Sequence, residues 1–368
     1  MRLLITTDTI GGVWTYTREL AEGLLRRGTK VTLVSFGEIP TLEQTAWMDA
    51  FPGLDFRPTG FRLEWMQDCE DDLAASAEYL RTVIDEVEPD LLHLNQYCYG
   101  SLDCEQPRVV VAHSDVIGWW NAVHRAEPKD SSWIRQYRRT VSCGLHAATA
   151  VVAPTQWMMS SLTANYLEPA QTRVIPNGRA PSRFLPYLKK EDYALSVGRV
   201  WDFGKNAGLL ARIDPPMQVY VVGDNRSPER RTEPSVLQGA SQRLVFQGVL
   251  DQDSLRHLYS RASIYIATSQ YEPFGLAPLE AALSRCALLV SDIPSFREVW
   301  GDAAWYFENN DPASLEREFE RLAGDPGLCA SMGKLAFEHA LEHYSAAGMV
   351  ERYSHLYRNL TRAGVLAA

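Results

Sequence analysis

Several common signatures are missing from this chain of 368 residues. Its six cysteines include no C-x-x-C pair, which argues against a thiolate metal site and a thioredoxin-like motif. A formal net charge of −10 argues against a general nucleic-acid binder, because such a protein needs a basic surface. The apolar stretch after Met1 is too short for a signal peptide, and no stop-transfer segment follows it. We therefore expect a cytosolic protein with reduced, scattered cysteines.

The dinucleotide fingerprint is also missing, although the chain opens like a nucleotide-binding domain. The pattern predicts a strand over residues 2–6, a helix after Gly11-Gly12, and a second strand over residues 30–35. The G-x-G-x-x-G spacing is absent, and no acidic residue for a ribose ends the second strand. The opening therefore predicts a doubly wound parallel sheet and disfavours an NAD-dependent dehydrogenase.

Short apolar runs divide the chain into two α/β halves, and its length suffices for two domains with their own cores. Each run has the length of a buried parallel strand. They cover residues 91–94, 109–113, 150–154 and 172–176 in the first half, and 193–199, 217–222, 244–246, 262–267, 288–292 and 304–307 in the second. Residues 179–192 lack periodicity and are the best linker candidate. We predict domains over residues 1–180 and 181–345, followed by a C-terminal helix over 346–368.

The most informative segment is the decapeptide Y-E-P-F-G-L-A-P-L-E. It places Glu272 in a loop after a buried strand and Glu280 about one turn into a helix predicted for residues 276–283. Two glutamates around a helix start are also common for purely structural reasons. However, the helix N-terminus between them is a natural seat for phosphate, with the backbone N–H groups of Phe274, Gly275 and Leu276. A sugar nucleotide, with phosphates and several hydroxyls, fits this arrangement.

This segment, extended through Ser291-Asp292, resembles the E-x7-E signature of the retaining glycosyltransferases of family four. Those enzymes have the GT-B fold, which implies two Rossmann-like doubly wound domains facing across a cleft. It also implies a C-terminal helix that crosses back to the first domain. The likeness covers nearly the whole chain and is strongest from Asn177 to Phe307.

The resemblance assigns the donor diphosphate to two cations, Arg199 and Lys205, which follow the first strand of the second domain. Arginine can grip phosphate in a bidentate manner, and lysine supplies a compact charge to a leaving group. Without the glutamate pair, two solvated surface cations would be the better interpretation. The resemblance further implies that Glu280 bonds the ribose hydroxyls and that Glu272 faces the transferred sugar. The three amides at the helix start then line the sugar and the phosphate.

Two residues of the first domain complete the set that the resemblance implies. His113 ends a strand and matches the family's histidine near the donor hexose, although a lone histidine at a strand end is more often structural. Gly12 is expected to open the first helix toward the diphosphate or the acceptor. The catalytic candidates are therefore His113, Arg199, Lys205 and Glu272, and the donor-binding candidates are Gly12, Arg199, Lys205, Glu272, Phe274, Gly275, Leu276 and Glu280.

The implied reaction retains the anomeric configuration, by front-face attack in which the departing diphosphate helps to deprotonate the acceptor hydroxyl. Fixed cations and amides replace a metal, so we expect no metal and no cofactor beside the nucleotide-diphospho-sugar substrate, a UDP- or GDP-sugar. His339 and His343 lie on one helix face, a spacing that suits a metal. No third ligand is evident, and we interpret this face as solvated.

Two departures from the family pattern concern neighbouring turns. Arg285 and Ala287 stand where the family usually has a glycine and a proline after the second glutamate. A non-glycine residue with positive φ costs on the order of 1 kcal/mol, unless the turn differs locally. Residues 292–298 replace a Gly-Gly pair often found near the sugar, which leaves the identity of the donor open.

The acceptor is a saccharide, a lipid-linked molecule or a small molecule. Trp119-Trp120 and the basic, aromatic segment 133–139 fall in the predicted first domain, where such enzymes usually bind acceptors. Aromatic faces stack on sugars, and a basic-aromatic helix can rest on an anionic membrane. For each residue alone, a core tryptophan pair and an ordinary surface helix are the better interpretation. We expect a cytoplasmic protein, with contact at the inner membrane face as the minority hypothesis.

Other functions share some of these features. GT-B proteins include epimerases and phosphorylases, and a catalytically silent sugar-nucleotide-binding partner would keep the same fold. A glycosidase also uses two carboxylates, but these must face each other across the scissile bond, which one loop-helix segment does not allow. The combined cation and glutamate set favours a hexosyltransferase of carbohydrate biosynthesis.

Overall fold

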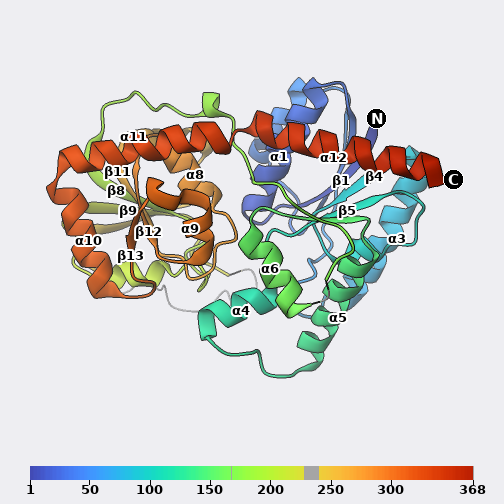
Figure 1. The fold of residues 1–368 in the computed structure, drawn as a ribbon, viewed down its shortest axis with the longest axis horizontal. Coiled ribbons are helices and arrows are strands. Elements are labelled where there is room, and N and C mark those ends of the chain that lie inside the picture. The colour runs from blue at the N-terminus through green and yellow to red at the C-terminus, as the bar shows by residue number, and fades with distance from the viewer. Residues whose placement is uncertain (167, 228–239, 368) are drawn as a thin grey trace. The chain divides into compact units, whose positions relative to one another are not determined.

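The computed structural model describes residues 1–166, 168–227 and 240–367, with side chains described to residue 362. These residues form two compact units, which we describe separately (Figure 1). Unit 1 comprises Met1–Gly118, Glu127–Gly178 and Ala346–Ala368, and unit 2 comprises Trp119–Ala126 and Arg179–Ser345.

Unit 1 is built on a parallel sheet of seven strands in the order β3-β2-β1-β4-β5-β6-β7. The strands are β1 (Arg2–Asp8), β2 (Lys30–Phe36), β3 (Leu54–Pro58), β4 (Leu91–Leu94), β5 (Arg108–Val111), β6 (Ala150–Ala153) and β7 (Thr172–Val174). Six of them confirm the predicted apolar runs. The sequence analysis missed β3, because this edge strand is half-exposed and carries Asp55 and Arg57 in place of a continuous apolar run.

Helices cover the sheet of unit 1, and the last helix of the chain is one of them. They are α1 (Gly12–Arg26), α2 (Leu42–Thr45), α3 (Glu70–Val87), α5 (Ser132–Ala147), α6 (Gln156–Asn165) and α12 (Ala346–Ala367), with 3-10 turns η1 (Ala46–Ala50) and η2 (Cys98–Ser101). In Figure 1, α12 runs along α1. Gly23 of α1 is so close to Val350 of α12 that a Cβ atom there would lie 2.4 Å from a valine methyl. The predicted return of the C-terminal helix to the first unit is confirmed.

Unit 2 has a parallel sheet of six strands in the order β10-β9-β8-β11-β12-β13. The strands are β8 (Glu191–Val197), β9 (Gln218–Val222), β10 (Leu244–Gly248), β11 (Ala262–Ala267), β12 (Ala287–Ser291) and β13 (Trp305–Phe307). The helices are α7 (Gln252–Arg261), α8 (Leu276–Leu283), α9 (Pro294–Trp300), α10 (Pro312–Gly324) and α11 (Pro326–His343), with 3-10 turns η3 (Pro181–Arg183), η4 (Ala207–Arg212) and η5 (Gly301–Ala303). The two-domain α/β architecture predicted from the sequence is confirmed.

The strand order of unit 2 predicts where its sheet binds a ligand. From β8, the sheet grows through β9 on one side and through β11 on the other, so the direction of winding reverses between β8 and β11. In open α/β sheets, ligands bind outside the carboxyl ends of the strands at this switch point. The loops that follow β8 and β11 are therefore where a site is expected.

Two local features differ from simple expectation. Helix α4 (Val116–His124) carries Trp119 and Trp120, which belong to unit 2 and not to the first domain as predicted. The physical reason is that the Trp119 indole Nε1–H donates to Asp202 Oδ1 over 2.9 Å. The predicted linker, residues 179–192, is not exposed throughout, because Arg179 at its start is buried.

The end of α8 keeps the left-handed turn of the family without its glycine. Arg285 has φ of 63°, and its N–H donates to Ala282 O over 2.8 Å. Its guanidinium carbon lies 5.8 Å and 5.5 Å from the ring centroids of Tyr187 and Phe337. These ring contacts offset part of the backbone strain.

Candidate functional site

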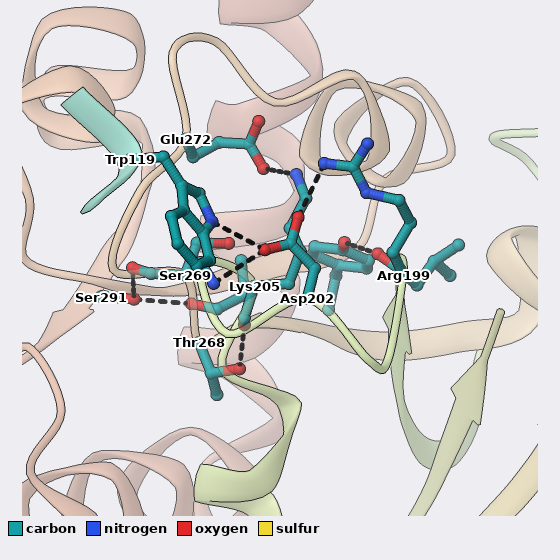
Figure 2. Close-up of polar contacts among 12 residues, drawn as sticks. Trp119, Arg199, Asp202, Lys205, Thr268, Ser269, Glu272 and Ser291 are labelled. Carbon is teal, nitrogen blue, oxygen red and sulfur yellow. Dashed lines mark hydrogen bonds and ion pairs between the residues drawn. The ribbon is translucent and has the colours of Figure 1, made fainter. Parts of the chain in front are cut away.

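The loops after β8 and β11 are tied to each other through backbone atoms. The Gly204 carbonyl accepts the N–H groups of Gln270 and Tyr271, at 2.8 Å and 3.1 Å. The Thr268 hydroxyl donates to the Lys205 carbonyl over 3.0 Å (Figure 2). Side chains on the two loops are therefore held at a constant separation, which a preorganised site requires.

The end of β12 supports the second of these loops from beneath. Ser291 is fully buried, and its hydroxyl lies 3.0 Å from the Ala267 carbonyl and 2.8 Å from the Ser269 carbonyl. A serine suits the end of this strand because its small buried hydroxyl can donate its one hydrogen to either of two nearby carbonyls. Figure 2 shows these contacts of Ser291 as dashed lines.

Lys205 and Glu272, two of the predicted residues, form an ion pair across the two loops. Both side chains are mostly buried, so the pair is only weakly screened by water. Each group neutralises the other at the point where a ligand with both phosphates and hydroxyls could engage them.

Arg199 is paired as well, with a carboxylate that the sequence analysis did not select. Its Nη2 lies 2.7 Å from Asp202 Oδ2, and its guanidinium carbon lies 5.4 Å from the Trp201 ring centroid. Asp202 Oδ1 accepts two further bonds, from the Gly204 N–H at 2.8 Å and from the Trp119 indole N–H. The D-x-G spacing was the available signal, because an aspartate often accepts the N–H two residues on.

Asp202 is ionised despite its burial. Burial by itself raises the pKa of this carboxyl, but the charges of Arg199 and Lys205 and the hydrogen bonds from Trp119 and Gly204 hold the pKa below its usual value. The four charged side chains of the two loops, two cations and two anions, thus carry no net charge.

The N-terminus of α8 lies directly after Glu272. Gly275 is its N-cap residue, with φ of 92°, and no side chain caps the helix. A Cβ atom on Gly275 would lie 3.1 Å from Pro278 Cγ and 3.2 Å from Phe296 Cε1, so glycine fits both the φ angle and the space. Phe274 has a buried ring and can offer a ligand its backbone only. The helix start carries the positive end of the helix dipole.

Glu280 faces a different partner from the other candidates. Its Oε1 lies 3.1 Å from Arg179 Nε, and both side chains are mostly buried. Arg179 also lies over the Phe184 ring, 5.5 Å from its centroid. Glu280, the carboxylate expected at a ribose, therefore pairs with Arg179, which lies 101 positions earlier in the chain. No local sequence pattern predicts this pairing.

A pocket at the switch point brings some of these residues together. Arg199, Lys205 and Glu272 line it, with Gly198 directly after β8 and Pro278 in the first turn of α8. Glu280 is not among its lining residues. Three of the candidates thus share one pocket, whereas Glu280 pairs with Arg179 outside its lining.

The remaining candidates, His113 and Gly12, belong to unit 1. His113 follows β5, and its Nε2 lies 2.8 Å from Asn95 Oδ1. Burial lowers the pKa of His113 to about 3, so the imidazole is neutral at physiological pH. Gly12 is the first residue of α1, after the N-cap residue Gly11 with φ of 95°, and no side chain caps this helix either.

The sequence-based interpretation of a solvated histidine face holds for His343, which is exposed, and is wrong for His339. His339 is half-buried, and its Nε2 lies 2.8 Å from the Val299 carbonyl. Its ring also lies 5.9 Å from Trp300. Within residues 1–166, 168–227 and 240–367, no group of three or more histidine, cysteine or acidic side chains is placed to hold a metal ion.

The basic segment on α5 is largely neutralised by neighbours in unit 1. Arg135 Nη1 lies 2.5 Å from Asp130 Oδ2, and Arg138 Nη2 lies 2.6 Å from Glu127 Oε2. None of the helices in the described part of the chain has the length and apolar character needed to span a bilayer.

Two models of known protein families together match most of the chain. The family model "Glycosyltransferase Family 4" matches residues 10–183, and the model "Glycosyl transferases group 1" matches residues 190–339. Alpha-maltose-1-phosphate synthase of Mycolicibacterium smegmatis is 27% identical over 304 residues, which are 73% of this chain and 76% of that protein.

Solved structures agree with this result at the level of the fold. Sucrose-phosphate synthase from Thermosynechococcus elongatus superposes with a TM-score of 0.81 at 18% identity, covering 99% of this chain and 100% of the other. Anabaena HepE, in complex with UDP and glucose, superposes with a TM-score of 0.76 at 15% identity, covering 98% and 100%. These likenesses show that the chain has the two-domain GT-B fold predicted from its sequence.

Proposed function

The chain is a glycosyltransferase of family 4, and from this premise we propose that it is a retaining hexosyltransferase. It moves a hexosyl unit from a nucleotide-diphospho-sugar, a UDP- or GDP-sugar, to a hydroxyl group of its acceptor. The observation that carries the proposal is the pocket in which Arg199, Lys205 and Glu272 converge beside the uncapped start of α8.

The donor diphosphate is bound by the two cations and the helix start. Charge develops on the diphosphate as its bond to the sugar breaks, and preorganised donors stabilise that charge without reorganisation. A diphosphate competes with Glu272 for the Lys205 ammonium. As the ion pair opens, the Glu272 carboxylate becomes free to accept hydrogen bonds from hydroxyls of the transferred sugar. One exchange of partners thus serves both ends of the donor.

Retention follows in this proposal from attack on the same face of the sugar as the departing diphosphate. A departing phosphate oxygen accepts the proton of the acceptor hydroxyl, while Arg199 and Lys205 hold the phosphate in place. The proposal requires no metal, since two fixed cations and the helix dipole supply the positive charge that a divalent ion supplies elsewhere.

The acceptor is a saccharide, a lipid-linked molecule or a small molecule. Two similar proteins are named as synthases of sugar phosphates, which supports the saccharide class. A cytoplasmic location with contact at the inner membrane face remains part of the proposal. The neutralised arginines on α5 weaken that contact, because anionic lipid attracts unpaired cations.

The test is release of nucleoside diphosphate from a panel of UDP-, GDP-, ADP- and TDP-sugars, followed by mass spectrometry. We expect release from one donor by the native protein, and at least about a 100-fold slower release by Glu272→Ala. The anomeric configuration of the product, read by NMR, then tests retention. Failure of every donor to react would contradict the transferase, and donor binding without reaction would favour a catalytically silent sugar-nucleotide-binding partner.

A further inference from the structure

Asp202 accepts hydrogen bonds from three donors that lie on two segments of unit 2, helix α4 and the loop after β8. Trp119 lies on α4, Arg199 begins the loop after β8, and Gly204 lies near the end of that loop (Figure 2). The residue is only 6% exposed, and its donors lie at 2.7 to 2.9 Å. A buried carboxylate bound in this way is fully used by the protein and does not itself bind a ligand.

Arg199, in contrast, donates only part of its guanidinium N–H groups to the protein. Asp202 and the Trp201 ring hold one edge and one face of the guanidinium, while the side chain is 37% exposed. Its Nε–H is buried and has no hydrogen-bond partner among the residues that the structure describes. Guanidinium has five N–H donors, so most of them remain for an anion. A buried N–H without a partner, next to an exposed part of the same guanidinium, is the pattern expected of a group that binds a ligand.

Close packing around Asp202 supports a fixed geometry. A Cβ atom on Gly204 would lie 2.6 Å from the Trp119 Nε1 atom and 3.1 Å from Asp202 Oδ1. Gly204 is therefore the residue that lets the indole reach the carboxylate. The same loop continues into Lys205, whose backbone N–H donates to the Asp202 carbonyl over 2.9 Å. Asp202 thus contacts both cation-bearing residues, one through its side chain and the other through its backbone.

We propose that Asp202 is a positioning residue of the donor site, which acts by holding the Arg199 guanidinium in the orientation that binds the donor diphosphate. The proposal rests on the proposed function, because it takes the ligand of Arg199 to be a diphosphate. Asp202 does not touch the donor. It selects which N–H groups Arg199 presents.

Two physical effects of Asp202 have opposite signs, which makes the proposal testable. Asp202 places a negative charge beside an anion site, so by charge alone its removal strengthens binding of a diphosphate. Asp202 also holds the Arg199 guanidinium in place. Removal of the carboxylate lets the guanidinium rotate away from the binding orientation, which weakens diphosphate binding and slows turnover. The proposal requires that the second effect exceed the first.

The experiment is a double-mutant cycle of Asp202→Asn and Arg199→Gln, measured as kcat and KM for the active donor and as Kd for its nucleoside diphosphate. We expect Asp202→Asn to lower kcat/KM about 30-fold, and Arg199→Gln about 100-fold. In the double variant the loss stays within about 3-fold of Arg199→Gln alone, because Asp202 acts through that side chain. A multiplied loss in the double variant, or tighter diphosphate binding by Asp202→Asn at unchanged kcat, overturns the proposal.

A matched control and a second variant keep the result interpretable. Glu318 accepts the Trp305 indole N–H at 3.0 Å and pairs with Arg321, so Glu318→Gln removes a similar carboxylate away from the pocket. We expect it to leave kcat/KM within about 2-fold of the native value. Should Asp202→Asn not fold, Asp202→Glu keeps the charge and displaces the carboxylate by one methylene. A native kcat/KM in a folded Asp202→Glu variant would then overturn the proposal, whereas a loss of about 10-fold supports it.

The same measurements separate the two proposals. Retained nucleotide binding without turnover of any donor contradicts the hexosyltransferase alone, since the cycle on Kd still tests Asp202. Turnover with a multiplied loss in the double variant contradicts the role of Asp202 alone. Absence of both binding and turnover contradicts both.

Discussion

Among the described residues of unit 2, each of the three cations at the candidate site has a carboxylate partner. Lys205 pairs with Glu272, Arg199 with Asp202, and Arg179 with Glu280. Such pairing lowers the cost of keeping charges in a mostly buried site. Under the proposed function, a donor therefore binds by exchange of partners with these pairs.

The third pair gives a prediction at the scale of one residue. If Glu280 accepts bonds from ribose hydroxyls, Glu280→Gln weakens binding of the nucleoside diphosphate about 10- to 100-fold, the worth of one or two charge-assisted hydrogen bonds. Isothermal titration with the nucleotide and with its 2′,3′-dideoxy analogue checks this. The variant and the native protein should bind the dideoxy analogue with similar affinity. An equal loss for both nucleotides would mean that Glu280 acts by holding Arg179 in place.

The residues of the candidate site differ in how well the sequence predicts them. The spacing around a helix start marks Glu272 and Glu280 as candidates, and the family resemblance selects them. The resemblance also assigns Arg199 and Lys205, which follow a strand. Trp119 and Arg179 carry no local signal, because their partners lie 83 and 101 positions away and are chosen by packing. Asp202 is marked only by the D-x-G spacing that its bond with Gly204 uses.

At the scale of one element, α8 shows how a helix can end without glycine. Its last turn is closed by the N–H groups of Arg285 and Cys286, which donate to Ala282 and Ala281 at 2.8 Å and 3.0 Å. Arg285 adopts the left-handed conformation that the sequence comparison predicted would be costly. Cation–π contacts with two rings compensate, at roughly 0.5–1 kcal/mol for an exposed pair.

Substitution of Arg285 separates the backbone strain from the side-chain contacts. Arg285→Ala loses the ring contacts and keeps the strain, so we expect the free energy of unfolding to fall by about 1–2 kcal/mol. Arg285→Gly loses the same contacts but relieves the strain, so it should be about 1 kcal/mol more stable than Arg285→Ala. Urea denaturation followed by tryptophan fluorescence measures both. Equal stability of the two variants would show that the turn stores no strain.

At the scale of the whole chain, buried polar groups in unit 1 link its first and last hundred residues. His93 on β4 lies 2.7 Å through Nδ1 from the Tyr357 hydroxyl on α12, and 3.3 Å through Nε2 from the Tyr16 hydroxyl on α1. Burial lowers the pKa of His93 to about 3, close to that of His113. Both imidazoles are therefore neutral in the folded protein.

These histidines predict a loss of stability in mild acid. Unfolded histidines, with a pKa near 6.5, bind protons that the folded ones do not bind until about pH 3. The contribution of these neutral histidines to the free energy of unfolding is therefore fully present above about pH 6.5. At lower pH the free energy of unfolding decreases by up to about 1.4 kcal/mol per pH unit for each histidine. Thermal unfolding between pH 7 and pH 4.5 checks this slope. His93→Gln should be less stable at pH 7 but show a shallower decline, and an unchanged slope would assign the acid sensitivity to other groups.

The sequence by itself determined the two α/β halves, twelve of the thirteen strands among the described residues, and the loop-helix segment with its two glutamates. These features depend on local patterns, namely apolar runs, helix starts and the spacing of charged residues, which any reader of the chain can follow. Only the tertiary structure decided that Trp119–Ala126 joins unit 2, that Arg179 holds Glu280, and that Asp202 holds Arg199. The reason is physical: a side chain chooses its hydrogen-bond partner by which groups the fold brings within about 3 Å, and sequence separation does not enter that choice.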